Sequence, residues 1–564
     1  MEKQHYDAIV VGSGISGGWA AKELTERGLK TLVIERGKEM IHRKSYTTDF
    51  SSPWDFEHRG KVNEELVASD YSIQAKCYAF SELNRDRFAN DRKSPYIQTK
   101  PFDWIRGDAT GGRSQLWGRQ TYRWSDLDFE ANAKDGHGVD WPIRYADIEP
   151  WYSYVEKFAG ISGSREGIPQ LPDSEFLPPM EMNCVEKDVK VKLEKAFPDR
   201  HMIIGRVAHL TKPQPVHLEL GRGQCQYRNQ CHRGCSFGAY FSSLSATLPA
   251  AAKTGNLQIV NNSIVKNVEY DPHTGRASGV RVIDAESQQE RSYSAKVIFL
   301  CASTVGTAQV MLNSVSERFP NGIANSSGVL GHYLMDHTMR AGARGTAPGY
   351  EDSYYSGRRP NGIYIPRFRN VTDKHPDFVR GYGYQGGASR EGWQRGINGE
   401  GFGESLKEKL HDPGPWTFSL TGFGEMLPRF ENRVELDSDK RDAWGMPQLK
   451  LNVSWSDNEH RMRIDIAESA AEMLKAAGLK DVRPYVVDHP PGLAIHEMGT
   501  ARMGRDPKTS VLNAHNQCHD IPNLFVTDGA AMASSAWQNP SLTYMALTAR
   551  AVDYAVKEMK ANRL

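Results

Sequence analysis

The chain has 564 residues, and its 70 lysines and arginines nearly balance its 69 aspartates and glutamates. Charged residues make up 25% and apolar residues 39% of the sequence, which is typical of a globular protein and excludes disordered and fibrous classes. The net charge of +1 gives no field that would favour nucleic acid or an anionic membrane surface. No apolar run approaches the length of a membrane-spanning helix, so we expect no direct membrane span.

The first 35 residues have the pattern of a strand, a helix and a second strand. Apolar residues over Asp7–Val11 predict a buried strand, the spacing over Gly14–Glu26 predicts a helix, and Thr31–Ile34 predicts the second strand. Because the N-terminus leads directly into a strand, we expect no cleavable signal peptide.

Three glycines in the turn between this strand and helix predict a dinucleotide site. Gly12 allows the tight turn, Gly14 lets the backbone approach a pyrophosphate, and Gly17 lets the helix pack closely on the strand. Glu35 ends the second strand 18 residues after Gly17, where its carboxylate can accept hydrogen bonds from ribose hydroxyls. This pattern leaves NAD and FAD open and argues against NADP. The alternative is a tight βα turn in another α/β fold.

Later segments add turns, strands and helices. Residues 107–118 form a second glycine-rich turn or a surface loop, and residues 523–530 predict a strand that ends in Asp528-Gly529. Asn539 precedes Pro540 at the start of a predicted helix that reaches Lys560, which is favourable N-capping chemistry. Four further segments alternate like strands of a meander: 256–260, 264–270, 277–284 and 297–301. Residues 457–478 have the spacing of an amphipathic helix.

Taken together, these motifs resemble the glucose–methanol–choline (GMC) oxidoreductase family. They occur in the order expected of that family: Gly12–Gly17 with Glu35, Gly111-Gly112-x-Ser114, Leu330–His337, His496–Gly504, Asp528-Gly529 and Asn539-Pro540. The resemblance implies FAD rather than NAD as cofactor, and an enzyme that oxidises the CH–OH group of an alcohol or sugar. It also implies an α/β fold in which a Rossmann-like FAD-binding lobe is interleaved with an α+β substrate lobe carrying a large, mostly antiparallel sheet.

The resemblance also divides the chain and supplies the residues at the cofactor. The FAD-binding lobe is expected over 1–45, 101–125, 205–340 and 485–564, and the substrate-binding lobe over 46–100, 126–204 and 341–484. Some members attach FAD covalently through a histidine at the position of Leu116, so FAD is expected to be non-covalent here. The residues expected at FAD are Gly12, Gly14, Gly17, Glu35, Arg36, Gly111, Gly112, Ser114, Trp117, Gly118, Val265, Asp528, Gly529, Pro540 and Ser541.

The catalytic pair implied by the resemblance is His496 and Asn539, which lie 43 residues apart. A neutral imidazole at His496 can take the hydroxyl proton while a hydride leaves the same carbon for flavin N5. Asn539 can hydrogen-bond the same oxygen and hold the C–H bond towards the flavin.

Three of the seven cysteines lie within eleven residues, at Cys225, Cys231 and Cys235. Three thiolates this close suit a metal centre: a 3Fe–4S cluster, or zinc with His232 as a fourth ligand. Reduced thiols, or one disulfide with a cysteine left over, are the alternatives. Nearby arginines would suit a negatively charged cluster or form a solvated rim, at Arg222, Arg228 and Arg233.

The same C-x5-C-x3-C spacing resembles a subset of bacterial GMC dehydrogenases, the catalytic subunits of FAD glucose dehydrogenases and glucoside 3-dehydrogenases. That resemblance favours a 3Fe–4S cluster that relays electrons to a cytochrome-type acceptor. It also implies a small partner subunit that carries an export signal, and hence a periplasmic location through that partner. A cytoplasmic location is the alternative.

We therefore expect an FAD-dependent dehydrogenase that oxidises a sugar or glycoside hydroxyl. Oxidation at C3 to a 3-keto sugar is the first expectation, and oxidation at C1 to a lactone is the second. An FAD-dependent sugar oxidase that uses O2 and has structural cysteines is the alternative. Aromatic and hydrogen-bonding side chains that suit a pyranose occur at Tyr382, Tyr384, Gln385, Trp393, Arg395 and Trp416.

Overall fold

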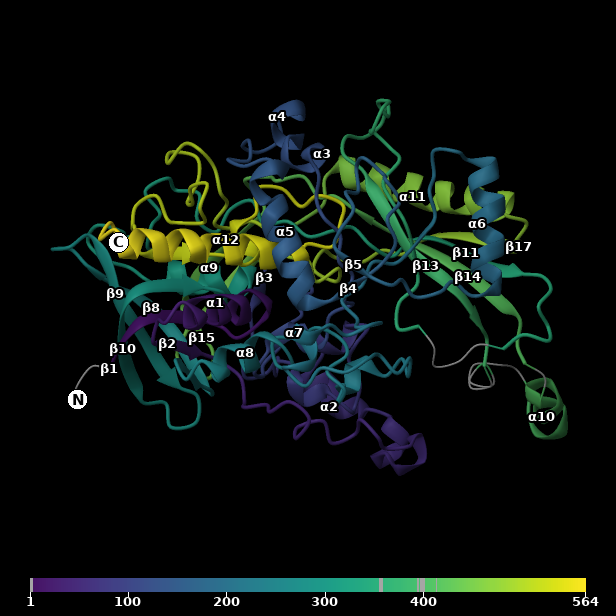
Figure 1. The fold of residues 1–564 in the computed structure, drawn as a ribbon, viewed down its shortest axis with the longest axis horizontal. Coiled ribbons are helices and arrows are strands. Elements are labelled where there is room, and N and C mark those ends of the chain that lie inside the picture. The colour runs from purple at the N-terminus through teal and green to yellow at the C-terminus, as the bar shows by residue number, and fades with distance from the viewer. Residues whose placement is uncertain (1–3, 355–358, 393–394, 396–400, 412) are drawn as a thin grey trace.

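The computed structural model describes residues 4–354, 359–392, 395, 401–411 and 413–564. The chain forms two lobes, each built around its own large sheet, and segments distant in sequence alternate between them (Figure 1). The predicted two-lobed α/β fold is confirmed.

The first lobe contains a seven-stranded sheet in which β7, β2, β1 and β10 run parallel, while β10, β9 and β8 form an antiparallel meander. The strand predicted over 256–260 exists, but it lies beside β2, at the opposite edge from the meander that it was expected to join. The strands are β1 (Gln4–Val11), β2 (Thr31–Ile34), β7 (Leu257–Val260), β8 (Ser263–Asp271), β9 (Arg276–Asp284), β10 (Glu290–Leu300) and β18 (Leu524–Val526).

Both faces of this sheet are buried, which explains why its central strands are apolar without interruption. Ala8 and Val10 pack into a core with helices α1 and α12, whereas Ile9 and Val11 pack into the largest core on the other face. The helices of this lobe are α1 (Ile15–Glu26), α5 (Tyr145–Ala159), α8 (Thr247–Lys253), α9 (Thr304–Leu312) and α12 (Ser541–Lys560).

The second lobe contains a six-stranded antiparallel sheet with the order β17-β11-β14-β13-β12-β6. Two helices, α6 (Cys184–Ala196) and α11 (Asp457–Ala476), cover one of its faces (Figure 1). The strands are β6 (Ile203–Ile204), β11 (Ala341–Ala347), β12 (Ile363–Ile365), β13 (Tyr382–Arg390), β14 (Trp416–Gly424) and β17 (Lys480–Val486).

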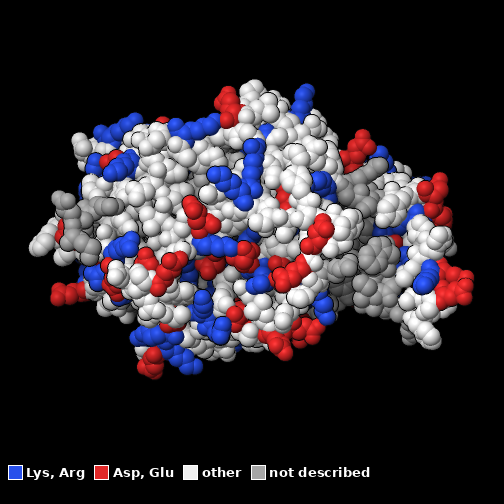
Figure 2. All heavy atoms as spheres, turned by 90° about the horizontal axis from the view of Figure 1, so that it is seen from below, with Lys and Arg blue, Asp and Glu red and all other residues white. Residues whose placement is uncertain are grey.

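Two small sheets and five short α-helices, together with single 3-10 turns, complete the part of the fold that the structure describes. Their elements are β3 (Ile97–Gln98), β15 (Arg433–Arg441) and β16 (Pro447–Asn452), then β4 (Ile161–Ser162) and β5 (Phe176–Leu177), with α2 (Glu64–Asp70), α3 (Asp126–Phe129), α4 (Ala131–Asp135), α7 (Pro215–Leu218) and α10 (Gly403–His411). Among the described residues, no helix combines the length and apolar character needed to cross a bilayer. Acidic and basic side chains are interspersed on the face shown in Figure 2.

The residue ranges predicted for the two lobes stay a prediction, and they can be compared with the strands of each sheet. The strands of the seven-stranded sheet fall in the ranges given to the FAD-binding lobe. Those of the six-stranded sheet fall in the ranges given to the substrate lobe, apart from the last two residues of β17, which extend past residue 484. Strands β15 and β16 also belong to the substrate-lobe ranges, yet their Val434, Leu449 and Leu451 pack into the largest core, together with Ile9 of β1.

Candidate active site

The main cavity, of about 600 Å³, lies where the carboxyl ends of β1 and β2 meet the uncovered face of the six-stranded sheet. Of the residues expected at FAD, Gly17 and Gly111 do not line this cavity. The others do: Gly12, Gly14, Glu35, Arg36, Gly112, Ser114, Trp117, Gly118, Val265, Asp528, Gly529, Pro540 and Ser541. His496 and Asn539 line the same cavity.

The three glycines of the first turn have different surroundings. Gly12 has a left-handed φ of 95°, and a Cβ on Gly17 would lie 1.9 Å from the Gly12 carbonyl oxygen, so neither position has room for a side chain. A Cβ on Gly14 would meet no protein atom within 4 Å. Packing within the protein therefore explains why Gly12 and Gly17 lack a side chain. At Gly14, the missing side chain leaves the backbone open to the cavity.

Glu35 lies buried at the end of β2, against this turn. Its carboxylate accepts hydrogen bonds from the Ser13 hydroxyl, the Ser13 amide at 3.1 Å and the Gly37 amide at 2.8 Å. Burial raises the pKa of the Glu35 carboxyl, and these hydrogen bonds act in the opposite direction. The Ser13 hydroxyl also accepts from the Gly111 amide at 2.8 Å, which ties the second glycine-rich turn to the first.

The second turn and the strand end at Asp528 complete the wall beside the glycines. Gly111 and Gly112 have left-handed φ values of 89° and 49°, and a short 3-10 helix over Gly112–Gln115 follows. Asp528 accepts from the Ala530 amide at 2.9 Å and from the Thr307 hydroxyl at 2.5 Å. Burial raises the pKa of Asp528 to about 6.

His496 and Asn539 meet at one end of the cavity, with Asn539 Nδ2 lying 3.2 Å from His496 Nε2. Burial, followed by His337 and Arg113, lowers the pKa of His496 well below its usual range, so its imidazole is neutral at pH 7. The N-capping prediction for Asn539 is wrong: Pro540 is the N-cap of α12 and no side chain caps it. The Asn539 side chain instead reaches across the cavity, where its Oδ1 accepts from Gln385 Nε2 at 2.8 Å.

A buried carboxylate holds the loop that carries His496. Asp336 accepts from the amides of Gly492 at 2.8 Å, Ala494 at 3.2 Å and His496 at 2.9 Å. Between them, Ile495 has a φ of 62°, a conformation that is unfavourable for a β-branched residue. Several hydrogen bonds to one carboxyl group can stabilise such a strained turn. Asp336 therefore fixes the backbone at the candidate catalytic histidine.

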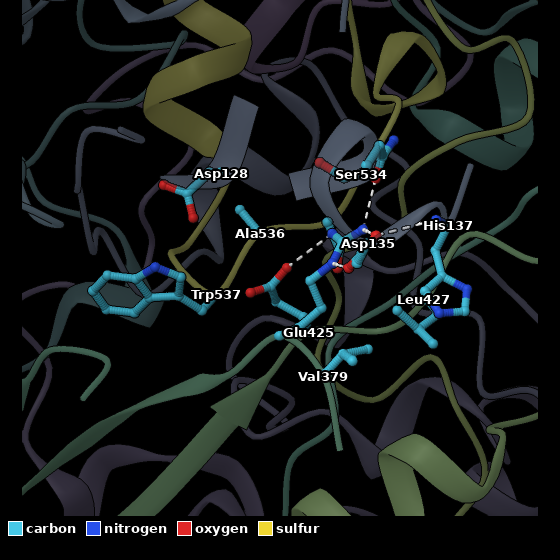
Figure 3. A network of polar contacts seen from close by, with 12 residues as sticks. Asp128, Asp135, His137, Val379, Glu425, Leu427, Ser534, Ala536 and Trp537 are labelled. Carbon is cyan, nitrogen blue, oxygen red and sulfur yellow. Dashed lines mark hydrogen bonds and ion pairs between the residues drawn. The ribbon is translucent and has the colours of Figure 1, made fainter. Parts of the chain in front are cut away.

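Buried polar contacts hold the segment before Asn539 in place, and Figure 3 shows the neighbouring network around Asp135 and Glu425. Gln538 Nε2 donates to Asp128 at 2.9 Å, and the Ser535 hydroxyl accepts from the Met426 amide at 3.0 Å. Figure 3 shows Asp128, Ala536 and Trp537 beside the carboxylate of Glu425. Burial and the Glu425 charge raise the pKa of Asp128 to about 7.

The six-stranded sheet presents polar side chains to the cavity, but most of the side chains predicted to suit a pyranose are not among them. Gln385 of β13 lines the cavity, whereas Tyr382 and Tyr384, on the opposite face of the same strand, lie buried against α11. Trp416 is buried in the same core, and Arg395 donates to the carbonyl oxygen of Lys409. Trp393 lies outside the described residues. The polar side chains of the second lobe and its rim that do line the cavity are Gln120, Asn361, Gln385 and Thr421.

The three clustered cysteines line a second cavity of about 20 Å³. All seven cysteines are free, so the predicted alternative of a disulfide is not observed. His232 does not line this cavity; its ring packs against Tyr78 at 5.4 Å. In the described part of the chain, no three His, Cys, Asp or Glu side chains converge on a point where one metal ion could bind. A zinc site of three cysteines and His232 therefore does not fit.

The arginines near the cysteines hold the loop in place. Arg222 is fully buried and donates to the carbonyl oxygens of Gly238 at 3.0 Å and Ala159 at 3.0 Å. Arg228 pairs with Asp49 at 2.6 Å, and Arg233 donates to backbone carbonyl oxygens of Thr48 and Ser51. These contacts do not describe a solvated rim, and the charges of Arg222 and Arg228 still act on Cys235 and Cys231.

Sequence analysis gave no role to several residues that shape the site. Asp336 and His337 belong to one of the family motifs. Arg113 and Glu497, which form an ion pair of 2.6 Å, belong to two other motifs. Their positions in the motifs were the available signal. Their partners are distant in sequence, so their contacts could not be read from it.

Comparison with known proteins places this geometry in a family. Residues 6–339 and 428–548 match two family profiles, both described as GMC oxidoreductase. Similar proteins include 2-methyl-1,2-propanediol dehydrogenase of Mycolicibacterium austroafricanum, 27% identical over 97% of this chain and 94% of the relative. The fructose dehydrogenase large subunit of Gluconobacter japonicus is 25% identical over 98% of both chains.

A solved structure supports the fold. Formate oxidase of Aspergillus oryzae RIB40 aligns over 100% of both chains with a TM-score of 0.61 and 14% sequence identity. The motif resemblance is thus confirmed by the profiles. The chain belongs to the GMC oxidoreductase family, whose enzymes are FAD-dependent oxidoreductases that act on CH–OH groups of alcohols and sugars.

Proposed function

We propose that this protein is an FAD-dependent dehydrogenase that oxidises a secondary or anomeric hydroxyl of a sugar or glycoside, with His496 as the base. The observation that carries the proposal is the buried, neutral imidazole of His496, 3.2 Å from Asn539 in the cavity that the glycine turn also lines. C3 is the first candidate carbon, on the resemblance to glucoside 3-dehydrogenases, and C1 is the second.

The residues around the glycine turn fit a bound dinucleotide. Gly14 borders the cavity, and a Cβ at this position would have no protein atom within 4 Å, which leaves the backbone open to a pyrophosphate. The N-terminus of α1 follows directly and favours negative charge there. Glu35 would accept from ribose hydroxyls. When bound, FAD supplies the acceptor for the hydride.

The candidate catalytic pair can bind and deprotonate a hydroxyl. The substrate O–H would donate to His496 Nε2, and Asn539 Nδ2 would donate to the same oxygen. The hydroxyl proton moves to Nε2, and the hydrogen on carbon leaves with its electron pair as the carbonyl forms. Among the described residues, Asn361 Nδ2 is a buried donor at the cavity with no hydrogen-bond partner, which suits a second substrate hydroxyl.

We expect flavin reduction to be independent of pH across the neutral range. The base must be neutral to accept a proton, and the pKa of His496 lies well below the usual histidine value, so protonation removes the base only at acid pH. Anaerobic stopped-flow measurements of the reduction rate from pH 5 to pH 9 test this. A rate that falls as the pH drops through the usual histidine pKa of about 6.5 would contradict it.

Products and electron acceptors separate the proposed dehydrogenase from the alternative oxidase. Turnover with an artificial dye and no hydrogen peroxide in air supports a dehydrogenase. Stoichiometric peroxide formation would instead establish a sugar oxidase. NMR of the oxidised sugar distinguishes a 3-keto product from a lactone.

We further propose that Cys225, Cys231 and Cys235 hold a 3Fe–4S cluster. The support is that three free thiols line one cavity, together with the resemblance of their spacing. Cysteines of a cluster bind different irons, so they need not converge on one point as zinc ligands do. The present cavity of about 20 Å³ has room for about one water, so the loop over 225–235 would have to open around a cluster.

Iron analysis and electron paramagnetic resonance of anaerobically purified protein test the cluster. We expect about three irons per chain and a signal from the oxidised cluster. Cys231→Ser should lose both, whereas Cys518→Ser, which changes a cysteine buried in the largest core and not lining this cavity, should keep them. A wild-type protein with FAD and no iron would show that the three thiols are structural.

We also propose a complex with a small subunit that carries an export signal, a cytochrome-type electron acceptor and a periplasmic location. The support is the cysteine spacing and the similarity to a protein described as a large subunit. Cell fractionation and co-purification of the native protein test this. Recovery of the chain alone from the cytoplasm would overturn it.

A further inference from the structure

The hydrogen-bond polarity around His337 follows from two backbone carbonyl groups. His337 Nε2 lies 3.2 Å from the Ser535 oxygen and 2.9 Å from the Ala536 oxygen. Carbonyl oxygens only accept hydrogen bonds, so Nε2 must carry a hydrogen. Burial lowers the pKa of His337 to about 4, so the ring is neutral and has no second hydrogen. His337 Nδ1 is therefore an acceptor.

This acceptor determines the tautomer of His496. The two Nδ1 atoms lie 2.8 Å apart, and the rings are nearly perpendicular, at 80°. Because His337 Nδ1 accepts, His496 Nδ1 must donate. A neutral His496 then has its only hydrogen on Nδ1 and a bare lone pair on Nε2. Nε2 is the atom that faces Asn539 in the cavity.

The same polarity determines the orientation of two amides. The bare Nε2 of His496 requires a donor, so Asn539 must present Nδ2 to it. Asn539 Oδ1 then accepts from Gln385 Nε2 at 2.8 Å. If both amides were flipped, Asn539 Oδ1 would face the bare Nε2, and two acceptors would meet. One direction of hydrogen bonding therefore runs from Gln385 through the catalytic pair to the Ser535 and Ala536 carbonyl groups.

We propose that His337 and Gln385 are positioning residues that keep His496 in its base-competent tautomer and Asn539 in its donating orientation. This inference rests on the proposed function. The other tautomer would place a hydrogen on Nε2 and could not accept the hydroxyl proton. A substrate hydroxyl that inserts between His496 and Asn539 finds an acceptor for its hydrogen and a donor for its oxygen. His337 does not line the cavity, so it acts only through His496.

Two variants of His337 test the inference in the FAD-loaded enzyme. His337→Leu removes the acceptor, and the rate of flavin reduction should fall on the order of 10²-fold, with substrate affinity unchanged. His337→Asn retains an oxygen that can accept from His496 Nδ1, and it should recover most of the rate. Gln385→Glu keeps the shape but replaces the donor to Asn539 by an acceptor, and it should also slow reduction. A wild-type rate in His337→Leu, or equal losses in its leucine and asparagine variants, would overturn the inference.

The tautomer can also be measured without substrate, which separates this inference from the proposed function. Protein containing ring-¹⁵N-histidine is loaded with FAD, and the His496 signals are assigned by comparison with His496→Gln. We expect a protonated Nδ1 and a bare Nε2 in the wild type, and a mixture in His337→Leu. A protonated Nε2 in the wild type would overturn the inference. If the spectrum is as expected but no sugar reduces the flavin, only the proposed function fails.

Discussion

We expect replacement of His496 by alanine to slow sugar-dependent flavin reduction by about 10²–10⁴-fold while FAD stays bound. The variant removes the nitrogen that faces Asn539, and general-base catalysis contributes about 10²–10⁴-fold to such reactions. The glycine turn and Glu35, which we propose to hold the dinucleotide, remain unchanged. The measurement is anaerobic stopped-flow reduction, with the bound FAD quantified from its visible spectrum.

His515→Ala is the matched control for this experiment. His515 is a partly buried histidine that stacks on Tyr554 at 3.9 Å and does not line the cavity. We expect it to retain the wild-type rate of reduction. If His496→Ala retained more than about a tenth of the wild-type rate, His496 would not be the base.

We expect replacement of Glu425 by alanine to destabilise the fold strongly. Glu425 lies between two buried arginines, 2.8 Å from Arg367 and 3.3 Å from Arg380, and these three side chains are at most 4% exposed. Arg380 also contacts Asn132 at 2.8 Å and forms an ion pair with Asp135 (Figure 3). Removal of Glu425 leaves positive charge buried without its partner, and the free energy of unfolding should fall by about 3–5 kcal/mol.

Denaturant titration of the FAD-loaded protein measures this change. Asp377→Ala provides the control, because its ion pair with Arg461, at 3.5 Å, has side chains that are 56% and 58% exposed. Loss of an exposed pair should change the free energy of unfolding by less than about 1 kcal/mol. Equal effects of Glu425→Ala and Asp377→Ala would show that this buried network does not stabilise the fold.

Sequence analysis predicted the elements whose signals are local. Strand Thr31–Ile34 and the helix at the end of the chain have the predicted positions, because apolar spacing and turn residues act over a few neighbours. The roles of Gly12 and Gly17 follow from their backbone surroundings in the same way. The antiparallel meander was also predicted, except that the strand at 257–260 pairs with β2 at the other edge.

The contacts that sequence analysis missed join residues far apart in the chain. Asn539 has good capping chemistry in isolation, but its partner Gln385 is 154 residues away on the other lobe. Tyr382 and Tyr384 share one face of β13, and sequence alternation does not tell which face meets the cavity and which meets α11. Sequence analysis left open whether Arg222 lies in a solvated rim. Its burial could not be predicted, because its partners are backbone carbonyl groups, which have no signature in the sequence.

The most direct test of the proposed function is an anaerobic visible spectrum of the FAD-loaded wild-type protein before and after the addition of glucose or a glucoside. We predict that the sugar bleaches the flavin bands, and that a broad brown absorption beside them marks the iron–sulfur cluster. A flavin that dithionite reduces, but that no sugar in a panel of hexoses and glycosides reduces, would contradict the assignment of this cavity to sugar oxidation.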